Sequence, residues 1–302
     1  MTTAQRDLRI GIIGGSGLGE VLLTEMDPAR TTTHDLVTPF GRPSAPVVTG
    51  DWRGVPIALL QRHGTGHRLP PSRVPYRANI FALRALGCTH VIASGATGSL
   101  REDIHPGELV VCDQLIDRTD GRPRTFFDNA AVHVEFADPF CPVMRDWLLA
   151  AVDAGPDVRV HDRGTYLCME GPSFSTRAES HLYRQWGADV VGMTALPEAR
   201  LAREAELAYV LVALPTDYDC WRSREPGTSE QSLLEEIIGN LRRATAASIA
   251  LIRAALSDVS MLRARPSPAH EALRLAIWTR PEAIAPSEID RLDGLWGHRL
   301  RS

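Results

Sequence analysis

The 302-residue chain contains no lysine, so all 33 of its basic residues are arginine. This absence excludes enzymes that form a Schiff base through lysine, including pyridoxal-phosphate enzymes, and it excludes a Walker A loop. Any anion held by a side-chain cation must therefore be held by arginine or histidine. A GC-rich genome, which favours arginine codons, explains the absence without a functional cause.

Long apolar runs, clustered basic residues and paired cysteines are missing too. No window approaches about 18 apolar residues, which predicts no membrane span. A net charge of -4 with dispersed arginines disfavours nucleic acid as a partner. The five cysteines form no CxxC or Cys/His cluster, which predicts free thiols and no metal site. The N-terminal residues do not resemble a signal peptide, so we expect a cytoplasmic protein.

Short apolar runs alternate with longer helical patterns along most of the chain. This alternation predicts an α/β fold in which helices cover a mixed, mostly parallel sheet. The predicted strands are residues 8–13, 47–49, 55–60, 90–93, 108–112, 158–160, 165–169, 189–191 and 209–214. The predicted helices are residues 76–86, 142–152, 176–186, 196–205 and 230–256.

Two segments do not follow this alternation. Residues 113–138 are polar with little periodicity, and a structureless loop of that length is usually functional, often a lid or a contact segment. Beyond a linker after the last long helix, short helical patterns occupy residues 270–278 and 286–296. We expect one domain over residues 8–256 and a C-terminal helical extension over 257–302 that docks on the body or on a neighbouring subunit.

Three predicted strand ends carry residues suited to an anion. The turn at residues 14–17 lets backbone N–H groups and the Ser16 hydroxyl approach a phosphate, although a plain tight turn is equally consistent. Arg62 can grip phosphate bidentately, with His63 as a further donor. Small residues at 94–99 form the third end. Ligands of such sheets bind at the carboxyl ends of strands, so convergence of the three ends would form an anion site.

An acidic pair follows the last predicted strand. Asp217 and Asp219 are two positions apart, and on an extended segment their side chains point the same way. Close like charges raise the pKa of one carboxyl group, which favours a proton donor or a shared proton. The pair could instead be a solvated turn or a metal site. Against a solvated turn, Tyr218, Cys220 and Trp221 are residues that favour burial.

Two apolar residues have a structural and a functional interpretation. Phe174 could cover an aromatic ring of a ligand or belong to the core. Met193 lies between a predicted strand and a predicted helix, and methionine fills gaps in cores more often than it contacts a ligand.

Taken together and in this order, the motifs resemble one family. They are GGSGL (14–18), RHG (62–64), GSLREDIHPGELVVCDQLIDRT (98–119), EGPSFSTRAE (170–179), GADVVGMTALPEARLAREAELAY (187–209) and TDYDCW (216–221). They are similar to those of the trimeric purine nucleoside phosphorylases, and within these to the 5'-methylthioadenosine phosphorylase branch, over about residues 10–256. The resemblance implies a single α/β domain whose mixed sheet forms a partial barrel flanked by helices.

The resemblance also implies two adjoining binding sites and an oligomer. Phosphate would be bound by Ser16, Arg62, His63, Thr194 and the backbone of Ala96. The ribose would lie against Met193, the purine against Phe174, and the base would be recognised by the catalytic pair Asp217 and Asp219. His133 would reach the 5' end of the nucleoside in an adjacent subunit of a homotrimer, and Leu233 and Leu234 suit a thioether there.

The activity implied by the resemblance is phosphorolysis of S-methyl-5'-thioadenosine to adenine and 5-methylthioribose 1-phosphate, with phosphate as co-substrate and no metal or organic cofactor. A carboxyl group at Asp217 can accept a hydrogen bond from a 6-amino group and donate a proton to N7, whereas an oxopurine suits an amide. Two residues depart from the family pattern. Gly95 stands where the family often has Thr or Asn, which implies one side-chain donor fewer near the phosphate. Glu230 implies a polar group near the 5' position, which leaves adenosine and 5'-deoxyadenosine open.

Other activities remain open at this point. The nearest is a phosphorylase for 6-oxopurine nucleosides or methylthioinosine. A hydrolytic nucleosidase would use water in place of phosphate, and Arg62 and Ser16 argue against it. A non-catalytic nucleoside-binding protein would not need the full set of site residues.

Overall fold

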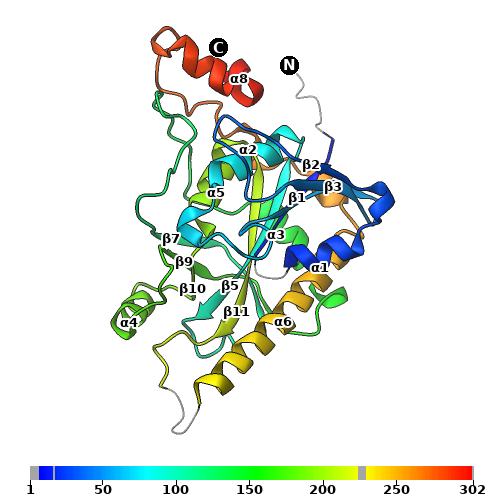
Figure 1. Ribbon diagram of the computed structural model, residues 1–302, viewed down its shortest axis with the longest axis vertical. Coiled ribbons are helices and arrows are strands. Elements are labelled where there is room, and N and C mark those ends of the chain that lie inside the picture. Colours follow the sequence, from blue (N-terminus) through cyan, green and yellow to red (C-terminus); the bar gives the residue numbers. More distant parts are fainter. Residues whose placement is uncertain (1–6, 16–17, 224–228, 301–302) are drawn as a thin grey trace.

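A mixed sheet of 11 strands forms the centre of the described chain, which comprises residues 7–15, 18–223 and 229–300 of a computed structural model (Figure 1). Its main path runs in the order β2-β3-β4-β1-β5-β10-β9-β7, and β11, β6 and β8 branch from β5. The strands are β1 (Ile10–Gly14), β2 (Thr32–His34), β3 (Val47–Trp52), β4 (Val55–Gln61), β5 (His90–Ser99), β6 (Leu109–Val111), β7 (Gln114–Arg118), β8 (Val160–His161), β9 (Thr165–Met169), β10 (Val190–Gly192) and β11 (Ala208–Asp217).

Helices cover both faces of this sheet. The α-helices are α1 (Leu18–Glu25), α2 (Tyr76–Ala85), α3 (Pro142–Leu149), α4 (Arg177–Gln185), α5 (Ala195–Glu204), α6 (Glu230–Ala255), α7 (Ser260–Ala264) and α8 (Pro286–Leu300). Short 3-10 helices lie at Pro28–Arg30, Pro71–Arg73, Val152–Ala154, Pro268–Glu271 and Pro281–Ala283. No single described helix has both the length and the apolar character to span a membrane; the bent pair Glu230–Ala255 and Ser260–Glu271 meets those criteria only when both helices are taken together.

Alternate residues of the central strands enter two different cores. On β1, Ile10 and Ile12 join the cluster that includes α1, α3 and α6, whereas Ile13 joins the cluster that includes α2 and α5. The same alternation runs along β11, where Val212 belongs to the first cluster and Leu211 to the second. This period of two follows from the pleat of a strand, and it confirms the predicted sheet with helices on both faces.

Strand β5 is longer than the sequence predicts. Residues 94–99, which we expected to follow the strand as its small-residue end, remain in the strand, because β11 pairs with one edge of β5 and β1 followed by β10 pairs with the other. Cross-strand hydrogen bonds thus override the weak strand preference of Gly and Ser. The sheet forks where β10 replaces β1, so it curves around β5 without closing into a complete barrel.

The prediction of a structureless segment at residues 113–138 is wrong for its first part. β7 (Gln114–Arg118) pairs in parallel with β9 at the edge of the sheet. The strand was missed because its residues are half-buried without apolar alternation. The remainder, residues 119–138, is irregular, and the side chain of Phe126 is fully buried in the core.

The C-terminal extension packs on the same chain. Trp296 of α8 is buried, its ring lies 4.8 Å from that of Phe126, and its indole N–H donates to the Glu204 carbonyl (3.0 Å). Figure 1 shows α8 beside α2, at the end of the molecule far from α6. The predicted helix at 270–278 is wrong, because only the 3-10 turn Pro268–Glu271 forms there and the chain then bridges to Val132 through Ile277.

Candidate active site

Three parallel neighbours, β4, β1 and β5, bring the predicted anion-binding segments together. Gly14 pairs with Gln61, and Ile13 pairs with Ala93, so the residues that follow lie at one level of the sheet. Gly15, Arg62, Gly95 and Ala96 all line a cavity of ≈ 330 Å³. The convergence on which the anion site depended is therefore present.

Arg62 is a fully buried cation with its counter-ion beside it. Its Nε and Nη2 donate to the two carboxylate oxygens of Glu198 (2.7 and 2.8 Å), and Nη1 donates to the Ser94 carbonyl (2.7 Å). Burial opposes the charged guanidinium, but the attraction of Glu198 outweighs it and raises the pKa of Arg62. The hydroxyl of Tyr209 also donates to Glu198 (2.8 Å). An anion in the cavity would meet an ion pair of zero net charge.

Gly15, directly after β1, lies close to Arg62 because it has no side chain. A Cβ at this position would lie 2.8 Å from the Ser94 carbonyl oxygen and 3.3 Å from Arg62 Nη1. Both separations are too short for an ordinary carbon contact, so glycine is required here. Ser16, the predicted phosphate ligand in this turn, lies outside the described residues.

His63 is a neutral ring rather than a cation. Its Nδ1 lies 2.8 Å from the Leu69 carbonyl, which can only accept, so Nδ1 carries the proton. Burial, together with the charge of Arg62, lowers the pKa of His63 to about 4. Nε2 is consequently an acceptor in this tautomer, and the expected contact of His63 with phosphate stays a prediction. The ring stacks on that of His67, with centroids 4.2 Å apart.

The acidic pair lies in the same cavity, and its geometry differs from the extended arrangement that we expected. Asp219 has a left-handed backbone (φ 50°), and its N–H donates to Asp217 Oδ1 (2.7 Å). The Thr216 hydroxyl donates to Asp217 Oδ2 (2.7 Å). Burial raises the pKa of Asp217, and the charge of Asp219 adds less than burial does. The raised pKa is as predicted, but its main cause is desolvation rather than the like charge.

Gly98 of β5 allows the acidic pair to lie against the sheet. A Cβ there would be 3.0 Å from the Cβ of Asp219 and 3.3 Å from Asp217 Oδ1. The pair is then held from both sides, since Trp221 donates to the Ser99 carbonyl (2.8 Å) and Asn240 donates to the Thr216 carbonyl (3.0 Å). These two bonds hold the backbone on either side of the pair, and the bonds from the Thr216 hydroxyl and the Asp219 N–H orient the Asp217 carboxyl group.

Arg62 lies at one end of the cavity and the acidic pair at the other. Met193, Thr194 and Phe174 also line the cavity and form the wall between these ends. Phe174 is 85 % exposed, so the alternative that placed it in the core is wrong. Thr194 is buried beside Gly95, where a Cβ would be 3.2 Å from the threonine hydroxyl. The cavity thus has a cationic end, an apolar wall and an acidic end.

Three predicted substrate-binding residues do not line this cavity. His133 is exposed beside the C-terminal extension, and its N–H donates to the Ala276 carbonyl (2.9 Å). Leu233 and Leu234 lie near the start of α6, where Leu234 is 57 % exposed. Their expected contacts with the 5' end of a nucleoside stay predictions.

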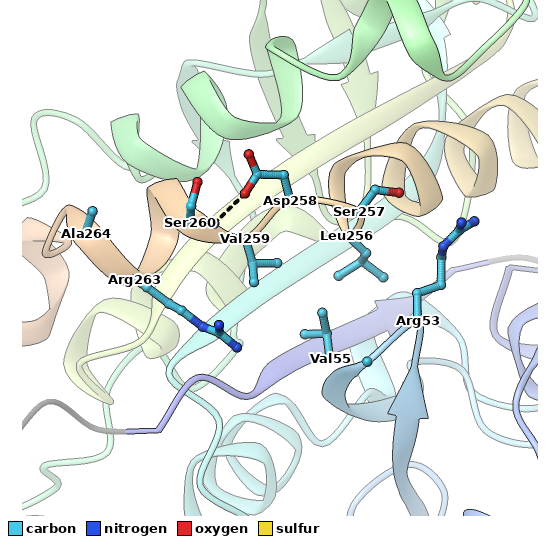
Figure 2. Close-up of a pocket in the computed structure, with 10 residues that line it drawn as sticks. Arg53, Val55, Leu256, Ser257, Asp258, Val259, Ser260, Arg263 and Ala264 are labelled. Atoms are coloured by element: carbon cyan, nitrogen blue, oxygen red, sulfur yellow. Dashed lines mark hydrogen bonds between the residues drawn. The ribbon is translucent and has the colours of Figure 1, made fainter.

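A second, shallower hollow of ≈ 520 Å³ lies between the β3–β4 turn and the end of α6 (Figure 2). The side chains of Arg53 and Arg263 lie at opposite sides of it, and the Asp258 carboxylate already accepts from the Ser260 N–H (2.8 Å). It contains no counterpart of the buried ion pair or the acidic pair. Within the described residues, no group of three or more His, Cys, Asp or Glu side chains could hold a metal ion.

A family model described as the phosphorylase superfamily matches residues 9–257. The chain belongs to the phosphorylase superfamily. It is 47 % identical to the S-methyl-5'-thioadenosine phosphorylase of Geobacter sulfurreducens, over 95 % of this chain and 98 % of that protein.

Two solved structures are similar to this phosphorylase. A methylthioadenosine phosphorylase from an antarctic soil metagenomic library has a TM-score of 0.85 and 43 % identity, and the match covers 96 % of this chain and 99 % of that one. A mutant of the adenosine/methylthioadenosine phosphorylase from Schistosoma mansoni, in complex with methylthioadenosine, has a TM-score of 0.75 and 36 % identity, over 86 % and 93 % of the two chains.

Several residues of this phosphorylase site carry no signal that sequence reasoning could use. Glu198 lies 136 positions after its partner Arg62, so only the fold shows that they are paired. Thr216 belongs to a quoted motif, yet its bond to Asp217 depends on a side-chain conformation. The other cavity residues to which the sequence assigned no individual role are His67, Pro71, Met169, Pro172, Ser175, Val191 and Gly192.

Proposed function

We propose that this phosphorylase splits S-methyl-5'-thioadenosine with inorganic phosphate, giving adenine and 5-methylthioribose 1-phosphate. The observation that carries the proposal is a single cavity with a buried guanidinium at one end and a carboxyl group of raised pKa at the other. The relatives bearing the name methylthioadenosine phosphorylase, at 43 and 47 % identity, support the same substrate.

Phosphate binds at the cationic end, through Arg62, Thr194, His63, Ser16 and the Ala96 N–H. Because Glu198 balances the charge of Arg62, hydrogen bonds rather than net charge hold the anion. The neutral His63 ring accepts through Nε2 from a phosphate hydroxyl, and the other groups donate. No metal or organic cofactor takes part. Phosphate is thereby fixed on one side of the ribose, which favours attack by reducing the entropy lost in reaching the transition state.

The purine binds against Phe174, with Asp217 and Asp219 at its edge, and the ribose lies against Met193. As the bond from C1' to N9 breaks, its electron pair goes to the purine. The Asp217 carboxyl group gives its proton to N7, and the electron pair of its O–H bond stays on the carboxylate. A phosphate oxygen then forms the new bond to C1'. The negative charge of phosphate also stabilises the developing ribosyl cation.

We propose that the enzyme is a cytoplasmic homotrimer whose substrates are small molecules, with neither nucleic acid nor a membrane as a partner. In the trimer, His133 of an adjacent subunit, with Leu233 and Leu234, covers the 5' methylthio group. The open mouth of the cavity, where Phe174 is exposed, supports a site that a neighbouring subunit completes.

A panel of nucleosides, assayed with and without phosphate, tests the proposed reaction. We expect methylthioadenosine to be split fastest, to adenine and a sugar phosphate, and only when phosphate is present. The panel includes adenosine, 5'-deoxyadenosine, inosine and methylthioinosine. Release of adenine without phosphate would indicate a hydrolase, and preferred cleavage of the two 6-oxopurine nucleosides would contradict the proposed base.

Gly171→Ala is expected to raise the KM for methylthioadenosine about tenfold, or ~1.4 kcal/mol. Gly171 has φ 67° and its missing Cβ would lie 2.5 Å from the sulfur of Met193, so the added methyl group must push that side chain into the ribose site. Steady-state kinetics at saturating phosphate measures this change.

Gly187→Ala is the matched control. Gly187 has φ 78°, and a Cβ there would meet nothing within 4 Å, so this variant suffers the backbone strain without the contact. We expect a lower melting temperature in both variants and an altered KM only in Gly171→Ala. Equal kinetics in the two variants would show that Met193 does not contact the nucleoside.

A further inference from the structure

Arg122 is a buried residue that joins two walls of the cavity without lining it. Nε donates to Glu170 Oε2 (2.7 Å) and Nη2 donates to the Glu170 carbonyl (2.6 Å). Nη1 donates to the carbonyls of Met193 and Leu196 (both 2.7 Å). One side chain, only 2 % exposed, therefore fixes the chain after β9 and the chain between β10 and α5.

Both of these segments reach the cavity directly beyond the bonds to Arg122. Pro172 and Phe174 follow Glu170, and Met193 uses its carbonyl for Arg122 while lining the cavity. The two segments are also close to each other. A Cβ added at Gly171 would lie only 2.5 Å from the Met193 sulfur. A small shift in either segment would change the width available for the purine and the ribose.

The guanidinium is itself held firmly. It lies 5.6 Å from the centre of the Tyr76 ring, and the Tyr76 hydroxyl accepts from Nη1 (3.2 Å). Glu170 Oε2 also accepts from the Asp120 N–H (3.0 Å), so the loop that carries Arg122 is attached to the same carboxylate. Without the guanidinium, the carbonyls of Met193 and Leu196 and the carboxylate of Glu170 would lose buried hydrogen bonds.

We propose that Arg122 is a positioning residue that sets the separation between the ribose wall at Met193 and the purine wall at Pro172 and Phe174. This inference rests on the proposed function, because it assigns both walls to a nucleoside. The planar fork of a guanidinium serves acceptors in several directions at once, whereas an ammonium group of equal charge is a single point with a shorter reach. Geometry, more than charge, is what Arg122 provides.

Thr194 shares a peptide group with the Met193 carbonyl, but the phosphate end also has anchors that do not involve Arg122. Arg62 is fixed by Glu198 and the Ser94 carbonyl, and the Thr194 N–H donates to the Tyr166 hydroxyl (3.3 Å). Loss of Arg122 should consequently affect the nucleoside much more than phosphate. A general weakening of the structure would affect both substrates alike, and this difference separates positioning from simple structural support.

Steady-state kinetics of Arg122→Met and Arg122→Lys tests the proposal. We expect the KM for methylthioadenosine to rise at least about tenfold in both variants, or ~1.4 kcal/mol, while the KM for phosphate changes less than about threefold. Failure of Arg122→Lys to restore the wild-type KM shows that charge alone is insufficient. An unchanged nucleoside KM, or equal increases for both substrates, would overturn the proposal.

Arg124→Met is the matched control. Arg124 is two positions further along, its side chain is 45 % exposed, and its ion pair with Asp117 is long (3.7 Å). We expect wild-type values of both KM constants. If Arg122→Met does not fold, Glu170→Gln replaces it. This variant keeps the bond from Arg122 to the Glu170 carbonyl and weakens only the contact with the side chain, so it should raise the nucleoside KM by a smaller factor and leave the phosphate KM unchanged. An unchanged nucleoside KM in this variant would contradict the positioning role.

Melting temperatures measured with adenine and with phosphate keep this proposal separate from the proposed function. Adenine should stabilise the wild type and lose most of that effect in Arg122→Lys, while the stabilisation by phosphate persists in both proteins. If the wild type does not split methylthioadenosine, the proposed function itself is wrong. If the wild type splits methylthioadenosine but adenine stabilises Arg122→Lys as much as the wild type, only the proposed role of Arg122 is wrong.

Discussion

Arg62→Ala is expected to lower the free energy of unfolding by about 3–5 kcal/mol and to raise the apparent KM for phosphate at least about tenfold. The first effect arises because Glu198 is fully buried and would lose the cation that balances it. The second arises because the phosphate end would lose its guanidinium. Chemical denaturation measures the stability, and initial rates at varied phosphate measure the KM.

A double variant separates the two effects. In Arg62→Met with Glu198→Gln, no buried charge is left unbalanced, and Tyr209 can still donate to the amide oxygen. We expect most of the lost stability to return while the phosphate KM stays high. Recovery of phosphate binding together with stability would mean that Arg62 acts only as a structural partner of Glu198. An unchanged phosphate KM in the single variant would place the anion elsewhere.

Asp217→Asn is expected to reduce kcat/KM for methylthioadenosine by at least about a hundredfold, since a general acid typically contributes that much or more. Preference should shift toward inosine-type bases, because an amide can donate to the 6-oxo group that a carboxylate repels. Rates with methylthioadenosine and with inosine, compared between the wild type and the variant, measure both changes.

The pH dependence of activity tests the role of Asp217 independently. Burial raises the pKa of Asp217, so the proton needed at N7 is retained to higher pH, and activity should fall as pH rises through that raised pKa. Asp217→Asn should remove this alkaline limb. Asp219→Asn should retain it, because the backbone N–H that binds Asp217 is unchanged. An alkaline limb that persists in Asp217→Asn would assign the proton to another group.

Local features of the sequence predicted the sheet, the helices and the convergence of strand ends. Strand β9 (Thr165–Met169) and the amphipathic pattern of α6 follow directly from their periodicity. The sequence predicted too early an end for β5, because Gly and Ser have a weak strand preference and only pairing on both edges keeps them in the strand. Periodicity alone contains no information about which edges will find partners.

The sequence predicted which residue types line the cavity, but not their ion pairs or their protonation states. The chain has no lysine, so the sequence made Arg62 the cation, yet its neutralisation by Glu198 depends on two segments far apart in the chain. His63 was expected to donate to phosphate, but its Nδ1 donates to the Leu69 carbonyl, which leaves Nε2 as an acceptor. Protonation states depend on burial and on distant neighbours, and both arise only when the tertiary fold has formed.

The two edges of β5 pair with strands from opposite parts of the chain, β1 before it and β11 after it. β5 pairs with β1 early, but its other edge waits for β11, whose first residue, Ala208, pairs with His90. A nascent chain therefore exposes an unpaired strand edge while most of the intervening chain is translated. Asp217 and Asp219, at the end of β11, are synthesised only then, so we expect a nascent chain that has paired β1, β4 and β5 to lack a base site.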